Sequence, residues 1–328
     1  MLSPRIAGLY LRTMNSQSRR GFLKAASAAI ATTGLAPSMV AQRFKPRMTL
    51  ALYPGSIGVK ANQMEAIRLA AKYGFQSVEA MPRDLTRMSD SQLGALTKAM
   101  EEGKIVFGSS GLTVNFKGSE TDFQDSLKAL PSVAEKLHSL GISRMNTWIS
   151  PSSHDLTYLA NMRRHADRLG QICRILADHS MMLGLEYIGT QTLRVRKRYP
   201  FIHTFAETLD LLSEVGARNC GFVLDTWHWW TAGDTPDQIL TLQPENIALV
   251  DLNDAPRDIP RESVMDNRRE LPVATGRIPV DDFLGALASI GYDGPVRAEP
   301  FNQKLNELDN DTACEVTITA LKSAMSLL

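Results

Sequence analysis

From residue 48 onward, short runs of apolar and β-branched residues alternate with longer segments in which apolar residues recur at helical spacing. Each short run ends in a polar residue, a glycine or a proline, which is typical of strands. Strands are predicted at residues 49–53, 77–81, 105–109, 144–149, 182–187, 221–224, 247–252 and 296–299. Helices are predicted between them at residues 62–73, 90–102, 122–140, 156–179, 205–215 and 282–290. The alternation predicts a series of βα units.

Glycine follows several of the predicted helices and indicates how the units connect. A glycine just past a helix permits the left-handed residue that ends it, so these positions predict αβ turns on the floor of a barrel. They are Gly74, Gly103, Gly141, Gly216 and Gly291. Eight parallel strands in about 280 residues fit a closed barrel better than an open sheet. No GxGxxG follows the first strand, which weakens a dinucleotide-binding alternative. We therefore expect one domain of the α/β class, a single (β/α)₈ TIM barrel over residues 45–328.

Composition and charge narrow the partners. The chain has 328 residues, of which 44% are hydrophobic and 22% charged, an ordinary globular composition. Its 36 basic and 35 acidic side chains leave a formal charge of +1, which favours neither a nucleic acid nor an anionic membrane as a partner. Cys173, Cys220 and Cys314 stand singly, so neither a zinc knuckle nor a disulfide framework is indicated, and we expect them to be small buried residues.

The N-terminus has the order of an export signal. Arg19 and Arg20 precede Gly-Phe-Leu-Lys, and residues 25–35 form an alanine-rich, weakly apolar run. This pattern resembles a twin-arginine signal, which predicts a signal peptide at residues 1–41, cleavage between Ala36 and Gln42, and a periplasmic or otherwise exported protein. The alternative is an amphipathic helix with a chance Arg-Arg pair. The run is too short for a membrane span of about 20 apolar residues, so the mature form is expected to be free of the membrane.

Carboxylates end four successive predicted strands. In a TIM barrel the active site forms at the C-terminal ends of the strands, so these side chains should meet at one mouth. They are Glu186, Asp225, Asp251 and Glu299. Each alone could be an ordinary turn residue, but together they would repel one another and raise one another's pKa unless a cation neutralised them. The pattern predicts a divalent metal ion held by all four. Oxygen ligands favour Mn²⁺ or Mg²⁺, and a contribution from His228 would admit Co²⁺ or Zn²⁺.

With these strand ends, the sequence resembles the xylose isomerase-like barrel superfamily, which includes sugar isomerases and epimerases, inosose dehydratases and endonuclease IV. The resemblance covers residues 48–328. It rests on the Glu186 strand, Asp225-x-x-His228, residues 250–254 (Val-Asp-Leu-Asn-Asp), 276–279 (Gly-Arg-Ile-Pro) and 291–295 (Gly-Tyr-Asp-Gly-Pro) ahead of Glu299. The last run is the most specific. Endonuclease action is disfavoured because a trinuclear zinc site needs more histidines than the six present.

The resemblance also implies roles for single residues. In the ketose-epimerase branch, the metal ligands are Glu, Asp, His and Glu, which correspond here to Glu186, Asp225, Asp251 and Glu299. Asp251 departs from the histidine of that branch and hardens the site. His228 and Arg257 occupy positions that resemble contacts to substrate hydroxyls. Thr192 replaces a glutamate of that branch, so the substrate pocket is expected to differ.

These features together predict a metal-dependent sugar isomerase or epimerase that acts on a ketose, an aldose or a related keto-sugar by ene-diolate proton transfer. Glu186 and Glu299 would be the paired base and acid. A leaving group at the β-carbon would make the same site a lyase or dehydratase of keto-sugars, keto-glycosides or inososes. A non-catalytic sugar-binding barrel is the alternative from another class.

Several other residues keep two interpretations. His154, after the fourth strand, could bind substrate and shuttle protons or could be a surface residue. The Trp227, Trp229 and Trp230 side chains could form a sugar-stacking wall or could pack under the loop. The cations Arg194, Arg196, Lys197 and Arg198 could be a solvated face or could grip an acidic group. A homo-oligomer stays open as well.

Overall fold

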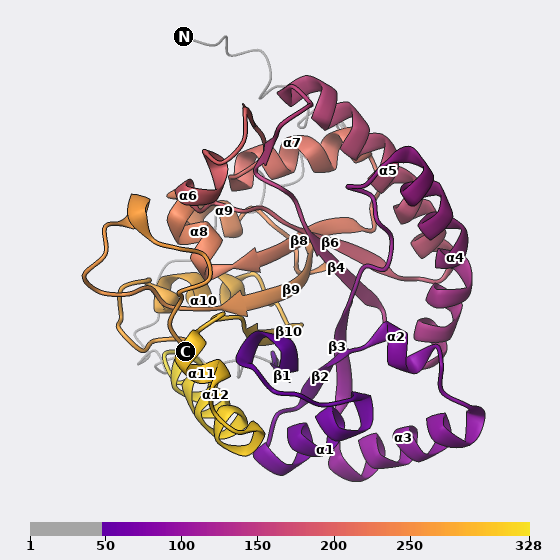
Figure 1. Ribbon diagram of the computed structural model, residues 1–328. Coiled ribbons are helices and arrows are strands. Elements are labelled where there is room, and N and C mark those ends of the chain that lie inside the picture. The colour runs from indigo at the N-terminus through magenta and orange to yellow at the C-terminus, as the bar shows by residue number, and fades with distance from the viewer. Residues whose placement is uncertain (1–47) are drawn as a thin grey trace, which may run out of the picture. The chain divides into compact units, whose positions relative to one another are not determined.

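The computed structural model describes residues 48–328, which form a closed barrel of eight parallel strands (Figure 1). The strands are β1 (Thr49–Leu52), β2 (Ser77–Ala80), β3 (Val106–Gly111), β4 (Arg144–Trp148), β6 (Met182–Glu186), β8 (Cys220–Asp225), β9 (Ile247–Leu252) and β10 (Pro295–Ala298). The barrel closes where β1 pairs with β10 on one side and β2 on the other. The predicted fold and all eight predicted strands are confirmed, with ends that differ by at most two residues.

Helices surround the barrel (Figure 1). The long ones are α1 (Gln63–Tyr73), α3 (Asp90–Gly103), α4 (Glu120–Ser139), α5 (Tyr158–Asp178), α7 (Phe205–Val215), α10 (Val280–Ser289) and α12 (Asn310–Met325). Short helices lie in the connections at α2 (Pro82–Leu85), α6 (Gln191–Arg194), α8 (Thr226–Ala232), α9 (Pro236–Ile239) and α11 (Gln303–Asn306), with 3₁₀ turns at Pro54–Ile57, Pro244–Asn246 and Arg261–Ser263. Among the helices of residues 48–328, none is long and apolar enough to cross a membrane.

Local sequence explains where the helices begin and end. Asn62, Ser89 and Ser119 each form a capping box at the start of α1, α3 and α4, which satisfies backbone N–H groups that the first turn leaves free. Four of the five predicted glycines end a helix with positive φ, namely Gly74, Gly141, Gly216 and Gly291. The prediction for Gly103 is wrong, because it is the last residue of α3 and Lys104 takes the left-handed conformation. A Cβ on Gly103 would lie 2.9 Å from the Ala71 Cβ, so glycine here permits close packing of α3 on α1.

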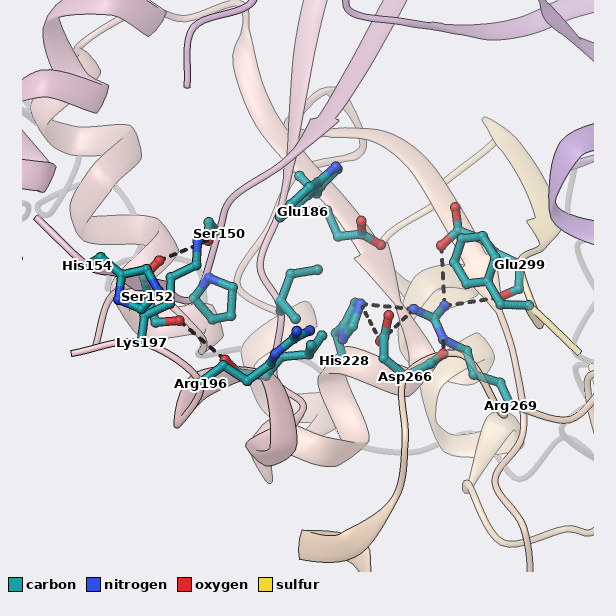
Figure 2. A pocket seen from close by; sticks show the side chains of 15 residues that line it. Ser150, Ser152, His154, Glu186, Arg196, Lys197, His228, Asp266, Arg269 and Glu299 are labelled. Carbon is teal, nitrogen blue, oxygen red and sulfur yellow. Dashed lines mark hydrogen bonds and ion pairs between the residues drawn. The ribbon is translucent and has the colours of Figure 1, made fainter. Parts of the chain in front are cut away.

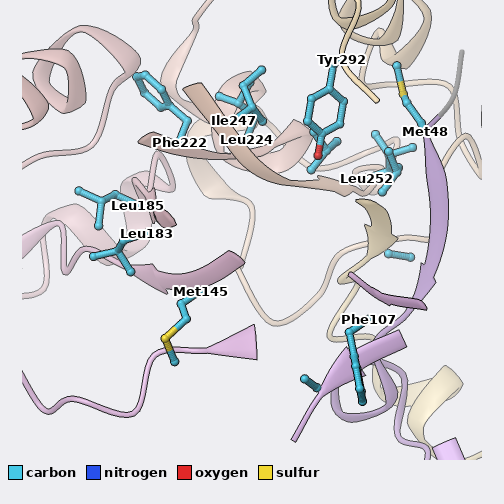
Figure 3. Close-up of a cluster of buried hydrophobic side chains, with 14 of the residues drawn as sticks. Met48, Phe107, Met145, Leu183, Leu185, Phe222, Leu224, Ile247, Leu252 and Tyr292 are labelled. Atoms are coloured by element: carbon cyan, nitrogen blue, oxygen red, sulfur yellow. The ribbon is translucent and has the colours of Figure 1, made fainter. Parts of the chain in front are cut away.

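The apolar core lies mainly between the strands and the helices. Leu183 and Leu185 point to the same side of β6, and Phe222 and Leu224 extend this layer on β8 (Figure 3). All four are fully buried. Because side chains alternate along a strand, the residues between them face the barrel interior. A second, small apolar cluster of Val223, Ala248 and Leu249, with Met182 against it, fills part of that interior.

Glycine admits this inner packing, because a Cβ at Gly184 would lie 2.6 Å from the Ala248 Cβ. Above the inner cluster the interior becomes polar, since the same alternation points Glu186, Asp225 and Asp251 inward at the ends of β6, β8 and β9. Two further strands, β5 (Ser152–Ser153) and β7 (Tyr199–Pro200), form an antiparallel pair that joins the loops after β4 and β6. The barrel therefore presents a polar mouth with one wall fixed by this pair.

Candidate active site

A cavity of about 440 Å³ opens at the C-terminal ends of the strands (Figure 2). Figure 2 shows Ser152, His154 and Lys197 at one end and Arg269 and Glu299 at the other. Its wall is formed by Trp148, Ser150, Pro151, Ser152, His154, Glu186, Ile188, Leu193, Arg196, Lys197, His228, Asp266, Arg269, Glu299 and Phe301. One end of the cavity is thus cationic, and the other mixes carboxylates with one guanidinium.

The strand ends bring the predicted carboxylates together. Oxygen atoms of Glu186, Asp251 and Glu299 lie within 4.8 Å of one another. Glu186 also forms a second group of the same size with Asp225 and His228, again with ligand atoms within 4.8 Å. All four carboxylates predicted from the sequence therefore lie in one cluster at the mouth, and Glu186 belongs to both groups.

Arg269 lies inside this cluster. Its Nη1 donates to Asp225 Oδ2 at 2.8 Å and to Glu299 Oε2 at 3.2 Å. Its Nη2 donates to Asp266 Oδ1 at 2.9 Å and lies 3.2 Å from His228 Nε2. The side chain is 1% exposed, so a buried guanidinium ties together two of the predicted metal ligands and the histidine.

A second buried guanidinium pairs with the third predicted ligand. Arg297 binds Asp251 through two parallel hydrogen bonds, Nε to Oδ1 at 2.6 Å and Nη2 to Oδ2 at 3.1 Å. Its Nη1 donates to Glu79 Oε2 at 3.0 Å, and Glu79 also accepts from the Ser109 hydroxyl. Asp251 thus shares both oxygens with Arg297, and Glu79 belongs to this interior network.

Burial and mutual repulsion raise the pKa values of the clustered carboxylates. Burial, reinforced by the neighbouring carboxylates Glu299 and Asp225, raises the pKa of Glu186 well above its ordinary value. The same causes, with Asp251 as the first neighbour, raise the pKa of Glu299 to about 8 despite Arg269 and Arg297. Burial raises the pKa of Asp225 to about 6 against the opposing effect of Arg269. Two guanidinium groups do not neutralise this cluster.

His228 is neutral in this setting. Burial, followed by the charge of Arg269, lowers its pKa to about 3. Since Arg269 can only donate, the His228 Nε2 accepts and its Nδ1 carries the proton toward Thr190 Oγ1 at 3.5 Å. A neutral imidazole with an accepting Nε2 has the form in which histidine ligates metals.

The donor set fits a divalent cation. Glu186 Oε1 is buried and has no hydrogen-bond partner within residues 48–328, which is costly for a carboxylate oxygen unless a ligand completes it. Each oxygen of Asp225, Asp251 and Glu299 that accepts from an arginine keeps a further lone pair. A cation at this point would also relieve the repulsion that raises the pKa values of the cluster.

Of the other predicted site residues, some line the cavity and some do not. His154 is exposed and lines the cavity at the end away from Arg269 and Glu299 (Figure 2). Arg257 lies outside the cavity, exposed, with its guanidinium donating to the Thr275 carbonyl. Trp227 and Trp229 are 0% and 2% exposed, so the packing interpretation of these tryptophans is confirmed and they form no wall. The three cysteines are free and buried, as expected.

Sequence reasoning missed several residues of the site. Arg269 lies in a loop and Arg297 in a strand, and no motif marks either one. A charge argument could have found them, because four inward carboxylates need buried cations. Trp148, which ends β4 and lines the cavity at 49% exposure, was also missed. Its position is equivalent to that of Glu186, its register partner on β6.

The fold and this cluster define a (β/α)₈ barrel with an acidic site at its mouth. A sequence profile described as xylose isomerase-like TIM barrel matches residues 67–323, and the chain belongs to that family.

Three characterised relatives show the range of this family. The chain is 22% identical over 271 residues to an inosose isomerase of Bacillus velezensis, covering 82% of this chain and 92% of that protein. It is 24% identical over 246 residues to a D-psicose 3-epimerase of Agrobacterium fabrum, covering 72% and 78%. It is 29% identical over 145 residues to a 3-dehydroshikimate dehydratase of Pseudomonas aeruginosa, but this covers 42% of the chain and 22% of the relative.

Solved structures agree on the fold. A xylose isomerase domain protein from Alicyclobacillus acidocaldarius superposes with a TM-score of 0.76 at 29% identity, covering 85% of this chain and 99% of that one. The IOLI protein, in a structure with a zinc atom, superposes with a TM-score of 0.71 at 20% identity, covering 85% and 98%. The relatives support an isomerase, epimerase or dehydratase at low identity.

Proposed function

We propose that this protein is a metal-dependent isomerase or epimerase of a sugar or related keto-sugar. The observation that carries the proposal is the arrangement of the half-buried Glu186 and the buried Glu299, whose carboxylate oxygens lie within 4.8 Å of each other at one cavity. Two carboxyl groups on one cavity can serve as a base that takes a proton and an acid that returns one. The relatives that isomerise inosose or epimerise D-psicose support the same class of chemistry.

In the proposed reaction, one carboxylate removes a proton from the carbon beside the substrate carbonyl. The other returns a proton to the neighbouring carbon or to the opposite face of the same carbon. Glu299 is held for this by Asn253, whose side-chain oxygen accepts from the Glu299 N–H at 3.1 Å, and by Arg269. Glu186 Oε1 has no hydrogen-bond partner among the described residues, so we assign to Glu186 the carboxylate that approaches the substrate.

A divalent cation would be held by Glu186, Asp225, Asp251 and Glu299, with His228 adjacent. When bound, it would polarise the substrate oxygens and stabilise negative charge on them. Oxygen ligands favour Mn²⁺ or Mg²⁺, and the neutral His228 leaves Co²⁺ or Zn²⁺ open. Arg269 would keep Asp225 and Glu299 oriented toward the same point.

A lyase or dehydratase is the second candidate, favoured by the partial similarity to a 3-dehydroshikimate dehydratase. The first step is the same proton removal. The electron pair then expels a group from the β-carbon, and the second carboxyl gives its proton to the leaving oxygen.

The test is exchange of carbon-bound hydrogen in D₂O. The purified full-length chain would be incubated with keto- and aldo-sugars, with Mn²⁺, Zn²⁺ or EDTA, and followed by NMR and mass spectrometry. We expect metal-dependent deuterium incorporation that Glu299→Gln and Glu186→Gln reduce by at least about a hundredfold, the range for loss of a general acid or base. Glu135→Gln, an exposed carboxylate on α4, is the matched control and should behave as wild type.

The product separates isomerase from lyase. Exchange that survives in Glu299→Gln would contradict the role of that residue. An absence of exchange on every sugar, with metal bound, would overturn the enzymatic proposal in favour of a non-catalytic sugar-binding barrel.

We further propose that residues 1–41, which lie outside the described residues, direct twin-arginine export. Replacing Arg19 and Arg20 by lysine should leave the precursor in the cytoplasm, and cell fractionation would show it. Periplasmic recovery of the doubly substituted chain would contradict the proposal.

A further inference from the structure

A second cavity of about 340 Å³ adjoins the first at its cationic end. The two share Trp148, Ser150, Ser152, His154 and Lys197. The second is lined by three cationic side chains, Lys117, Arg164 and Lys197, and by one carboxylate, Asp155. The combined space is therefore longer than the carboxylate cluster needs, and its far end is positively charged.

Lys117 is held in place by the loop that carries it. The buried Arg168 donates to the carbonyls on both sides of it, Phe116 and Gly118, at 2.8 Å each, and pairs with Glu120. Lys117 Nζ donates to the Trp148 carbonyl at 2.9 Å and lies 3.2 Å from the centre of the Trp148 ring. Both partners are neutral. Burial lowers the pKa of Lys117 to about 7 against the opposing charge of Glu186, and an anion bound beside it would favour its charged form.

Lys197 and Arg196 are placed by a different fixed element. The antiparallel pair of β5 and β7 joins their loop to the loop of Ser152 and His154, and Ser152 Oγ donates to the Leu193 carbonyl at 3.3 Å. Lys197 Nζ donates to the Ser150 hydroxyl at 3.4 Å, again a neutral partner. Figure 2 shows Lys197 beside Ser152 and His154, away from Glu299.

We propose that Lys117, Arg196 and Lys197 form a subsite for an oxyanionic group, so that the substrate is an acidic sugar or keto-sugar whose carboxylate or phosphate lies at the end away from the reacting carbons. This inference rests on the proposed function. The reacting carbons would lie at Glu186 and Glu299, the sugar would cross the exposed Trp148 side chain, and the anion would reach the cationic wall. Within residues 48–328, the hydrogen-bond partners of Lys117 and Lys197 are neutral, and the exposed Arg196 lines the first cavity next to Lys197, so an anion there would have three basic side chains to pair with.

The test is a comparison of matched sugars by titration calorimetry on the full-length chain with Mn²⁺. The carboxylate arm pairs D-glucuronate with D-glucose and D-galacturonate with D-galactose, and the phosphate arm pairs D-fructose 6-phosphate with D-fructose. We expect at least one acidic member to bind about tenfold or more tightly than its parent, the size of a charge-assisted contact. The arm with the larger ratio identifies the anion.

The variants are Lys117→Met, Arg196→Met and Lys197→Met, with Arg198→Met as the matched control. Arg198 is the next residue in the chain, is exposed and lines neither cavity. Each of the three variants should move the ratio toward one, and Arg198→Met should keep it.

A ratio near one for every pair, no binding of any acidic sugar, or a ratio that survives in all three variants would overturn the subsite. Failure of the proposed function gives a different result. Deuterium exchange on neutral sugars with a ratio near one keeps the reaction and removes the subsite, whereas tight anion binding without exchange on any sugar removes the reaction.

Discussion

Arg297 is a buried cation that holds one carboxylate of the cluster, Asp251, and a neighbouring acid, Glu79. It makes a bidentate pair with Asp251 and a further bond to Glu79, and it lies over the Tyr53 ring with 4.1 Å between the guanidinium carbon and the ring centre. Removing one member of a buried ion pair leaves the other charge uncompensated. Arg297→Met is therefore expected to lower the free energy of unfolding by about 3–5 kcal/mol.

Chemical denaturation would measure that loss. Arg218→Met, an exposed arginine, is the control and should stay within about 0.5 kcal/mol of wild type. Adding Asp251→Asn to Arg297→Met should recover part of the loss, because it removes the unpaired charge. If Arg297→Met were as stable as the control Arg218→Met, Asp251 would not depend on Arg297.

His165 predicts a pH dependence of stability outside the carboxylate cluster. Its Nδ1 donates to the Asn161 carbonyl at 2.9 Å, and its ring packs between Phe116 and Phe201. Burial lowers its pKa to about 4. The unfolded chain, with an ordinary value of about 6.5, binds the proton first as pH falls. Stability from this group is complete above pH 6.5 and is lost toward pH 4, by roughly 3 kcal/mol at most.

The measurement is the free energy of unfolding across that pH range. His165→Phe should flatten the slope because its ring does not titrate. His138→Asn, an exposed histidine on α4, should retain it. A slope that is unchanged in His165→Phe would assign the pH dependence to other groups.

The carboxylates of the site could be predicted from the sequence, whereas the two buried arginines that pair with them could not. Glu186, Asp225 and Asp251 could be predicted because each follows a run of apolar residues and ends a strand, so alternation turns them inward. Arg269 reaches the cluster from a loop after β9, and its position depends on the path of that loop, which local sequence patterns do not encode. Arg297 alternates inward like a core residue, so only the charges around it explain its presence.

At the scale of elements, Asp254 connects two segments that the sequence shows as separate motifs. Its Oδ2 accepts from the backbone N–H of Thr275 and Gly276, and its Oδ1 from those of Arg277 and Ile278. The side chain also accepts from the N–H of its own neighbour Ala255 and is fully buried. The end of β9 is thereby tied to the loop before α10.

Asp254→Ala is expected to lower the free energy of unfolding by about 3 kcal/mol or more, because several buried N–H groups lose a charged acceptor at once. Hydrogen exchange should increase at residues 275–278. Asp258→Ala, an exposed position in the same loop, is the control. Unchanged exchange at residues 275–278 would mean that the loop is held by other contacts.

Elements with strong local signals were predicted to within a few residues, since capping residues and helical spacing define them. The helices of the crossover after β8 were not predicted from the sequence. The crossover consists of the short helices α8 and α9, whose lengths follow from packing rather than from helical periodicity. Gly189 shows such a packing constraint. A Cβ there would lie 2.3 Å from the His228 carbonyl oxygen, so the loop after β6 packs directly against α8.

For the whole molecule, the barrel order follows from the number of strands and their parallel connections, which the sequence pattern indicates. The closed barrel has a consequence for its own stability. The carboxylates lie on β6, β8 and β9 and just after β10, so they meet only when the barrel is closed. A cation that binds them therefore binds the folded chain and not the unfolded one.

Such a ligand raises the free energy of unfolding by about 2.7 kcal/mol at a hundred times its dissociation constant. For a domain of this size, that amounts to a rise of several degrees in Tm, at roughly 2–4 °C per kcal/mol. We expect this rise in a thermal melt with Mn²⁺ or Zn²⁺ and its reversal by EDTA. Glu186→Gln should lose most of it, because Glu186 belongs to both ligand groups, while Glu135→Gln should keep it. A rise in Tm of equal size in Glu186→Gln would mean that the cation binds elsewhere on the molecule and that the carboxylate cluster does not couple metal binding to stability.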